Sequence, residues 1–198
     1  MIILGLTGSI GMGKSTTAGF FLAAGIPVYN ADEAVHELYE SKPVIEKLRQ
    51  IFPDSITEGR IDRAKLSKEI IADSSKLQLL ESIIHPLVRQ KEKAFIRKYR
   101  EEHAKLVVLD IPLLFESGPE GRVDKIAVVS APSSIQRQRV LARPGWSRKK
   151  LDHLLSRQIP DSEKRQRADF IIDSSQGLAY AQKQVQAIIA ELTGDKQQ

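Results

Sequence analysis

Residues 6–16 read Leu-Thr-Gly-Ser-Ile-Gly-Met-Gly-Lys-Ser-Thr, and this stretch decides the fold. It fits the pattern G-x-x-x-x-G-K-[S/T], with Gly8, Gly13, Lys14 and Ser15 at the fixed positions. Glycines at the two glycine positions let successive backbone N–H groups point inward around a phosphate, where a side chain would obstruct the approach. The lysine supplies a positive charge for the outer phosphates, and the serine hydroxyl is placed to hold Mg²⁺.

The surroundings of this stretch support a nucleotide-binding loop. Residues 2–6 form a short apolar run that predicts a buried parallel strand, and residues 14–24 predict a helix that stops at Gly25. A helix in that position directs the positive end of its dipole at the same anion. Because the motif follows a predicted strand and opens a predicted helix, we interpret it as a phosphate-binding loop rather than a chance glycine-rich turn.

Four further apolar runs predict strands, at residues 26–29, 106–109, 126–129 and 170–172. Helical patterns separate them. Short apolar strands that alternate with helices predict an α/β fold with an open parallel sheet covered by helices on both faces. We expect a single domain over residues 1–198, with helical insertions after the second and fourth strands.

The insertion after the second strand has its own helical pattern. A helix over residues 31–49 is broken near residues 41–43, and residues 62–102 predict two or three helices. His85-Pro86 marks a helix start or a kink there, because proline lacks the backbone N–H of a helix interior. A last helix over residues 178–192 precedes a polar tail.

Composition excludes several classes of protein. The 198 residues are 41% hydrophobic and contain no cysteine, so a disulfide scaffold, a thiolate zinc cluster and a cysteine nucleophile are excluded. The N-terminus lacks a basic region, and the longest uncharged run, residues 15–31, contains Pro27 and Asn30. This run resembles neither a signal peptide nor a membrane span. We expect a cytoplasmic protein without a membrane partner.

The positive charge is concentrated in residues 137–167, which hold ten Lys or Arg against three acidic residues. The segment can be a solvated helix face, a nucleic-acid surface or a lid that brings guanidinium groups to a phosphoryl group. Nucleic-acid surfaces interleave aromatic residues, and only Trp146 lies here. We favour the lid, bounded by Pro144-Gly145 and the region of Pro160, and expect no specific nucleic-acid partner.

Other nucleotide-binding classes lack their motifs in this chain. Asn30 is the only asparagine and Ala31 follows it, so the guanine-reading Asn-Lys-x-Asp motif of ordinary GTPases is impossible. No Gly-Gly pair exists for a transporter-type signature loop, and the chain is too short for paired helicase motors. What remains is phosphoryl transfer to a second small molecule.

Two acidic residues follow predicted strands. Asp32 lies just beyond the second strand, where it could accept a proton from an attacking hydroxyl or hold that hydroxyl in line. It can equally be a helix N-terminal acid, as the adjacent Glu33 suggests, and His36 can be its partner or a surface residue. Asp110 ends a strand as a Mg²⁺ ligand would, and residues 111–116 predict a pocket wall that ends in an acid.

These segments together resemble the dephospho-CoA kinase family. The resemblance extends from residue 1 to about residue 177, in the family's order, and is carried by residues 6–16, 31–32, 85–88, 110–116 and 168–173, together with Gln136, Arg139, Arg143 and Gln158. It implies a P-loop kinase with a five-stranded parallel sheet, a helical acceptor-binding insert over residues 31–102 and a helical lid over residues 137–167.

The resemblance also implies a reaction, in which MgATP phosphorylates the ribose 3′-hydroxyl of dephospho-CoA in the last step of coenzyme A synthesis. The residues that it implies as catalytic are Asp32, Lys14, Arg139 and Arg143. Those implied for ATP are Gly8, Gly11, Met12, Gly13, Lys14, Ser15 and Thr16. Those implied for the acceptor are Asp32, His85, Pro112, Leu113, Leu114 and Glu116, and those for the metal are Ser15 and Asp110.

The sequence departs from the family at two places. Asn30 stands where many members have Asp, and Leu154 stands where many have Arg. Neither change touches residues 8–15 or Asp32. A nucleoside monophosphate kinase stays open as an alternative enzyme, and a nucleic-acid binder regulated by the phosphate loop stays open as a non-catalytic one. We expect a monomer or a weak homo-oligomer.

Overall fold

A computed structural model describes residues 1–119 and 121–194, and the end of the predicted polar tail, residues 195–198, lies outside the described residues. The chain divides into two compact units. Residues Met1–Tyr29 and Lys98–Gln198 form one, which we call the sheet unit, and residues Asn30–Arg97 form the other, which we call the helical unit. Each unit is described below by itself.

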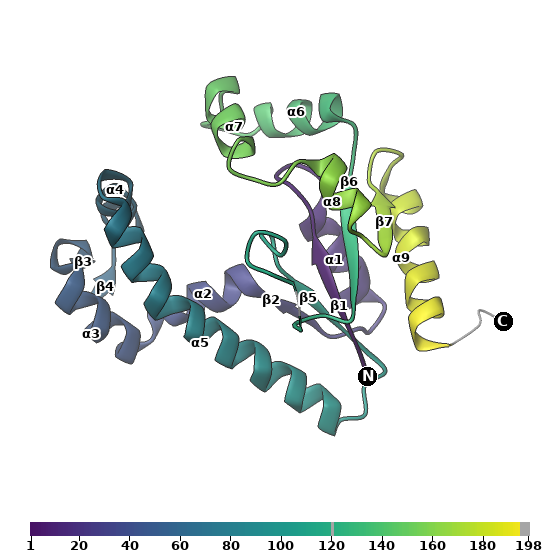
Figure 1. The fold of residues 1–198 in the computed structure, drawn as a ribbon, viewed down its shortest axis with the longest axis horizontal. Coiled ribbons are helices and arrows are strands. Elements are labelled where there is room, and N and C mark those ends of the chain that lie inside the picture. Colours follow the sequence, from purple (N-terminus) through teal and green to yellow (C-terminus); the bar gives the residue numbers. More distant parts are fainter. Residues whose placement is uncertain (120, 195–198) are drawn as a thin grey trace. The chain divides into compact units, whose positions relative to one another are not determined.

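The sheet unit is built on a five-stranded parallel sheet with the order β2-β5-β1-β6-β7. The strands are β1 (Ile2–Thr7), β2 (Val28–Asn30), β5 (Leu106–Asp110), β6 (Lys125–Ser130) and β7 (Phe170–Asp173) (Figure 1). In the register of the sheet, Leu4 of β1 pairs with Val108 of β5 and with Lys125 of β6. The five strands predicted from apolar runs are therefore confirmed, and together they form one parallel sheet.

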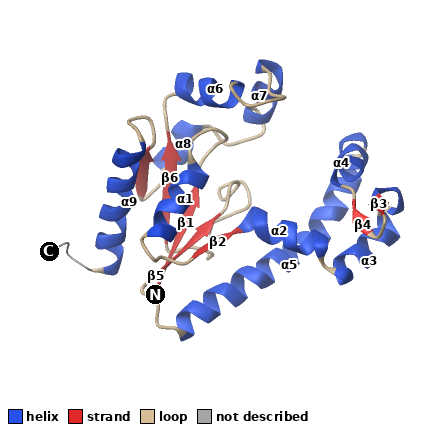
Figure 2. Cartoon of the chain, turned by 180° about the vertical axis from the view of Figure 1, so that it is seen from behind, coloured by secondary structure: helices blue, strands red, loops and turns tan. Residues whose placement is uncertain are grey.

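Helices cover one face of this sheet with the main core. The helices of the sheet unit are α1 (Lys14–Ala23), α6 (Ser133–Leu141), α7 (Arg148–Leu155), α8 (Asp161–Gln166) and α9 (Leu178–Thr193) (Figure 2). Helices α1 and α9 pack against each other and on the same side of the strands. Phe21 of α1 and Val185 and Ile188 of α9 belong to the same buried core cluster as Leu6 and Val108 of the strands.

The opposite face is covered by the segment after β5 and by α8. A Cβ added to Gly5 would lie 2.7 Å from Cδ2 of Leu114 and 3.1 Å from Cγ1 of Val123, so this segment packs directly on β1. Ser130, which ends β6 on this face, donates a hydrogen bond of 2.7 Å to Asp161 at the start of α8. Alternation of side chains along each strand separates these contacts from the α1–α9 core.

The helical unit has a second core. Its elements are α2 (Ala31–Glu40), α3 (Lys42–Ile51), the 3₁₀ turn η1 (Pro53–Ser55), β3 (Ile56–Thr57), β4 (Arg60–Ile61), α4 (Arg63–Ala72) and α5 (Ser74–Glu101), the last of which continues into the sheet unit. Its core is formed by Leu38, Val44, Leu48, Phe52, Leu66, Leu80, Ile83 and Ile84. The break near residues 41–43 is confirmed, since α2 ends at Glu40 and α3 begins at Lys42.

The structure adds two details to the prediction for the helical unit. Of the two alternatives at His85-Pro86, a helix start or a kink, the start is excluded, because Pro86 lies inside α5. Packing of the flanking apolar residues compensates for the one backbone hydrogen bond that proline removes. The antiparallel pair β3–β4 was not predicted. Its turn is Glu58-Gly59, with φ of 51° and 75°, rather than one of the dipeptides that signal a hairpin.

Within residues 1–119 and 121–194, none of the helices combines the length and the apolar character that crossing a bilayer requires.

Candidate active site

The phosphate loop lies between β1 and α1, and its glycines are required by the surrounding protein. A Cβ on Gly8 would lie 2.6 Å from the carbonyl oxygen of Val129. One on Gly11 would lie 2.5 Å from Cγ2 of Val140, and φ at Gly11 is +78°. Gly13, the residue before α1, has a φ of +91°. The loop therefore takes a conformation that only glycine adopts without strain, with its backbone free to approach an anion.

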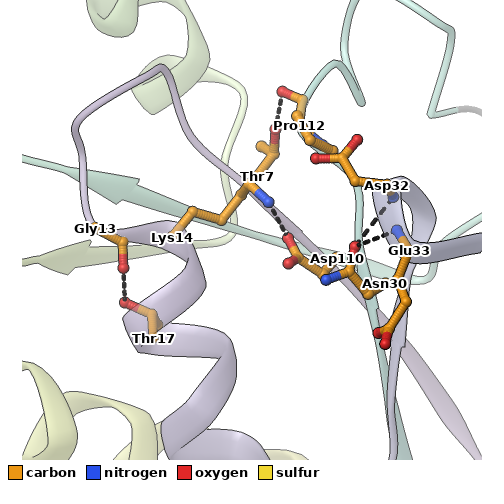
Figure 3. A network of polar contacts seen from close by, with 9 residues as sticks. All are labelled: Thr7, Gly13, Lys14, Thr17, Asn30, Asp32, Glu33, Asp110 and Pro112. Carbon is orange, nitrogen blue, oxygen red and sulfur yellow. Dashed lines mark hydrogen bonds and ion pairs between the residues drawn. The ribbon is translucent and has the colours of Figure 1, made fainter. Parts of the chain in front are cut away.

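Lys14 and Asp110 meet at the carboxyl edge of the sheet. The Lys14 ammonium is 2.5 Å from Oδ1 of Asp110, and the Asp110 side chain is only 2% exposed (Figure 3). Thr7 at the end of β1 donates a hydrogen bond of 3.0 Å to the Pro112 carbonyl, which joins β1 to the segment after β5. The adjacent strands β1 and β5 thus bring the predicted phosphate-binding cation and the predicted metal ligand together.

Arg139 closes the phosphate loop from the side of α6. Its guanidinium donates to the Ser174 hydroxyl at 2.9 Å and to the Ser174 carbonyl at 2.7 Å. The Ser174 hydroxyl in turn donates to the Met12 carbonyl at 2.7 Å, and Gln136 donates to the Ile10 carbonyl at 2.8 Å. Sequence analysis missed Ser174, whose only signal is its place two residues after the last predicted strand.

A cavity of about 260 Å³ opens beside the loop. Its polar rim carries Gly11, Gly13, Thr16, Arg139 and Arg143, five of the residues predicted for ATP or for catalysis. Its apolar side is formed by Phe20, Leu178 and Ala181. Ser15, the second residue of α1, is exposed. The side chain of Met12 is buried, and its sulfur accepts a hydrogen bond from the Ala131 N–H, so this residue can serve a ligand only through its backbone.

The segment after β5 divides between surface and core. Leu113 is 45% exposed, whereas Leu114 is fully buried and packs on Gly5. The Glu116 carboxylate lies 2.9 Å from the ammonium of Lys164. Of the predicted acceptor contacts in this segment, Leu113 presents its side chain to solvent and Pro112 is half-buried.

Asp32 is the second residue of α2 and lies two residues after β2 ends. Asn30 is the N-cap of α2, and its side-chain oxygen accepts hydrogen bonds from the N–H groups of Asp32, at 3.0 Å, and Glu33, at 3.2 Å (Figure 3). Asparagine caps a helix as well as aspartate does. The departure from the family at residue 30 therefore keeps the cap, and leaves the Asp32 carboxylate exposed.

A second cavity, of about 250 Å³, lies within the helical unit. Asp32 and Arg63 are its charged lining residues, and Val35, Tyr39, Ser67, Leu66, Ile70 and Leu80 complete it. The Arg63 guanidinium lies 5.6 Å from the centre of the Tyr39 ring and contacts the ring nitrogen of His36. Burial raises the pKa of the Tyr39 hydroxyl, and the charge of Arg63 opposes that rise.

This arrangement resolves the two roles considered for His36. Its ring contacts Arg63 and lies 4.0 Å from Glu40, one turn along α2, so the structure pairs it with these residues on an exposed surface. His85 is exposed on α5 and is not part of the lining of the second cavity. Sequence analysis missed Tyr39 and Arg63, because neither stands in a motif.

The residues suit a divalent cation that arrives with a nucleotide. In the part of the chain that the structure describes, no group of three or more His, Asp or Glu side chains could hold a metal ion. Mg²⁺ is usually bound by one or two carboxylates and the phosphates of a substrate, with water completing the shell. Asp110 and the Ser15 hydroxyl are the protein groups that this mode requires.

Comparison with known proteins gives one consistent result. The family model described as CoaE, dephospho-CoA kinase, matches residues 2–180. The chain is 54% identical to the dephospho-CoA kinase of Mesorhizobium japonicum over 198 residues, covering 99% of each chain, and 54% identical to that of Bartonella quintana over 192 residues, covering 97% of this chain and 98% of the other.

Solved structures agree with the family match. The dephospho-CoA kinase from Campylobacter jejuni superposes with a TM-score of 0.68 at 25% identity, covering 97% of each chain. The Thermus thermophilus protein TT1252 superposes with a TM-score of 0.84 at 38% identity, covering 98% of each. A shikimate kinase from Acinetobacter baumannii, at 18% identity and a TM-score of 0.53, covers 100% of this chain and 96% of its own and shares the fold alone.

Proposed function

The chain belongs to the dephospho-CoA kinase family, and from that premise we propose that it transfers the γ-phosphoryl group of ATP to the ribose 3′-hydroxyl of dephospho-CoA. The observation that carries the proposal is the meeting of Lys14 and Asp110 beside a loop that only glycine can form. In the reaction the bond between the γ-phosphorus and the ADP oxygen breaks, a bond from the 3′-oxygen to phosphorus forms, and the hydroxyl proton leaves.

The sheet unit binds the nucleotide. Backbone N–H groups of residues 8–13 surround the phosphates, and the Lys14 ammonium neutralises charge on them. The cavity beside the loop takes the nucleoside, because Phe20 and Leu178 offer apolar surface to a base while Arg139 and Arg143 face its phosphates. Gly8, Gly11, Met12, Gly13, Ser15 and Thr16 complete the ATP contacts.

The metal site is formed by Ser15 and Asp110. Mg²⁺, when bound there, neutralises charge on the phosphate oxygens of ATP. The Lys14–Asp110 pair implies an exchange of partners on nucleotide binding, in which Lys14 turns to the phosphates and Asp110 retains a cationic partner. Low exposure of Asp110 makes these charge interactions stronger than they would be in water.

Residues 31–102 bind the acceptor, and residues 137–167 form the lid. Asp32 orients the 3′-hydroxyl and receives its proton. The second cavity takes part of dephospho-CoA, with Arg63 facing its phosphate groups and the apolar lining facing uncharged parts. Pro112 and Leu113 form a wall of the acceptor site, and His85 contacts the acceptor. The lid carries Arg143 and Arg139.

The test is a transfer assay with each acceptor separately. Incubation with MgATP and dephospho-CoA is expected to yield ADP and a product phosphorylated on the ribose 3′-oxygen, as identified by phosphorus NMR. Phosphate on the 5′-phosphate of a nucleoside monophosphate, with none on dephospho-CoA, would establish the alternative enzyme. Nucleic-acid binding with a steep salt dependence and no transfer would establish the non-catalytic alternative.

Other parts of the prediction stay predictions. A cytoplasmic location remains a prediction, to be checked by fractionation of cells, and a monomer or weak homo-oligomer is checked by sedimentation of the full chain.

A further inference from the structure

A lysine of the sheet unit is fully buried at a place apart from the phosphate loop. The side chain of Lys164, in α8, is 0% exposed, and its ammonium lies 2.9 Å from Oε1 of Glu116. Burying an ammonium is costly unless an opposite charge compensates it. Glu116 therefore compensates the charge of Lys164 in this structure. Lys164 is not one of the solvated cations of the basic segment.

The same carboxylate oxygen has a second partner. The N–H of Ile159 donates a hydrogen bond of 3.0 Å to Oε1 of Glu116. Ile159 precedes Pro160, at the predicted C-terminal limit of the mobile part of the lid, and Glu116 ends the segment that begins after Asp110. One oxygen thus joins the end of the lid to the segment that starts at the metal ligand.

One further contact joins the same segments, and another joins α8 to β6. The Arg167 guanidinium lies 4.5 Å from the centre of the Phe115 ring, next to Glu116 in the chain. Asp161, the first residue of α8, accepts the hydrogen bond from Ser130 at the end of β6. The segment after β5, the end of β6 and α8 therefore meet in one buried polar cluster on the face of the sheet opposite α1 and α9.

Hydrogen bonding in this cluster is incomplete. Within the described residues, four buried side-chain atoms have no hydrogen-bond partner, namely Glu116 Oε2, Gln158 Oε1, Asp161 Oδ1 and Lys164 Nζ. The close approach of Lys164 to Glu116 is an ion pair without hydrogen-bond geometry. Charge attraction holds the pair, so loss of either charge leaves the other buried without its compensation.

We propose that Glu116 and Lys164 are positioning residues for the phosphoryl transfer, which hold the C-terminal end of the lid against the segment that follows Asp110. This inference rests on the proposed function. It replaces the acceptor contact that the family resemblance implies for Glu116. The pair acts through Asp110 and through Arg139 and Arg143 of the lid, so it supports turnover more than substrate affinity.

The experiment compares Lys164→Met, Glu116→Gln and the variant with both changes. Methionine keeps the length of the lysine stem, and glutamine keeps an oxygen for the Ile159 N–H. Each single change is expected to lower kcat by about tenfold or more, with the KM for ATP and for dephospho-CoA changed by less than about threefold. Loss of both charges is expected to be milder than Lys164→Met alone, because no charge is then left unpaired.

Two controls separate positioning from folding. Lys164→Arg keeps the charge and is expected to recover most of kcat, and Lys183→Met, an exposed lysine on α9, is expected to match the wild type. Thermal unfolding gives the folded fraction of each variant. A wild-type kcat for folded Lys164→Met would overturn the proposal. So would a raised KM for dephospho-CoA in Glu116→Gln alone, since that marks a substrate contact.

A readout without acceptor keeps this inference distinct from the proposed function. Hydrogen exchange of residues 111–116 and 156–164 is expected to accelerate together in both single variants of the free protein. Unchanged hydrogen exchange in both segments would overturn the proposal that Glu116 and Lys164 hold them together, even if the enzyme is active. Wild-type protein that leaves dephospho-CoA unphosphorylated refutes the proposed function, while the exchange result still decides whether Glu116 and Lys164 join the segments.

Discussion

The cavity beside the phosphate loop and the cavity in the helical unit have nearly the same volume, about 260 Å³ and about 250 Å³, but they are built differently. The first lies beside the phosphate loop, where a Cβ on Gly11 would collide with Val140, and its lining also includes Arg139, Arg143 and residues between Ser174 and Ala181. The second is formed by side chains from α2, α4 and α5 that are up to 48 positions apart in the chain, from Asp32 to Leu80. Backbone geometry thus defines the phosphate loop of the first site, whereas side-chain packing alone defines the second.

The largest expected effect is on the phosphate loop. Lys14→Met removes the ammonium that neutralises the phosphates, and we expect kcat/KM to fall by on the order of 10²–10³. ATP affinity, measured by calorimetry with Mg²⁺, should fall as well. Lys183→Met is the matched control. A variant with nearly normal ATP binding and turnover would show that the loop's N–H groups suffice without the lysine.

The next effect distinguishes chemistry from helix stability in the helical unit. Asp32→Asn is expected to lower kcat by on the order of 10²–10⁴ while ATP binding stays close to normal. Glu33→Gln is the control, because both residues occupy the first turn of α2 and donate to the same Asn30 oxygen. Equal, small losses in the two variants would reduce Asp32 to an acid at a helix N-terminus.

The cavity of the helical unit is tested by Arg63→Met. We expect the KM for dephospho-CoA to rise about tenfold, because a charge-assisted hydrogen bond is lost, with little change in the KM for ATP. Arg49→Met is the control, since Arg49 belongs to the same unit and forms an exposed ion pair with Glu46. Initial-rate kinetics with each substrate varied in turn separates the two values. A higher KM for ATP alone would contradict the placement of Arg63 in the acceptor site and would assign it to ATP binding.

Alanine substitutions at two glycines of the sheet unit are expected to change the free energy of unfolding in opposite directions. Gly11→Ala is expected to destabilise by about 1–3 kcal/mol, because its Cβ meets Val140 and its φ is positive. Gly19→Ala, in the exposed face of α1 where a Cβ meets nothing within 4 Å, is expected to stabilise by about 0.5–1 kcal/mol. Urea unfolding measures both. A stabilised Gly11→Ala would mean that the loop relaxes at no cost.

The smallest effect concerns Asp173, at the end of β7 beside Ser174. Hydrogen bonds from the Ser175 side chain, then from the Ser175 N–H and the Gln176 amide, lower the pKa of the Asp173 carboxyl. Since the pKa is lower in the folded chain than in the unfolded one, the carboxylate stabilises the fold above about pH 4, and this is lost as pH falls through the folded value. Asp173→Asn should flatten the acid limb of stability against pH. If the loss of stability at acid pH is unchanged in this variant, other carboxylates cause that loss.

Local signals predicted most of the sheet unit. Each strand is a contiguous apolar run, and the phosphate loop is a contiguous motif between a strand and a helix, so neighbours in the chain define them. The Asn30 cap is local in the same way, although its side chain appeared from sequence only as a departure from the family. The helix start that was one of two alternatives at Pro86 is excluded, because tertiary packing of α5 outweighs the local cost of proline.

Sequence by itself therefore determined the parallel sheet, the phosphate loop and the acid that follows the second strand, since each depends on residues a few positions apart. Tertiary structure alone decided that Ser174 holds Arg139, that Arg63 lies over Tyr39 in a cavity, and that Lys164 is buried against Glu116. These contacts join residues 24 to 48 positions apart, and a charged residue on a helix has the same pattern whether it is solvated or buried. Its environment is set by what packs on it, which no local pattern records.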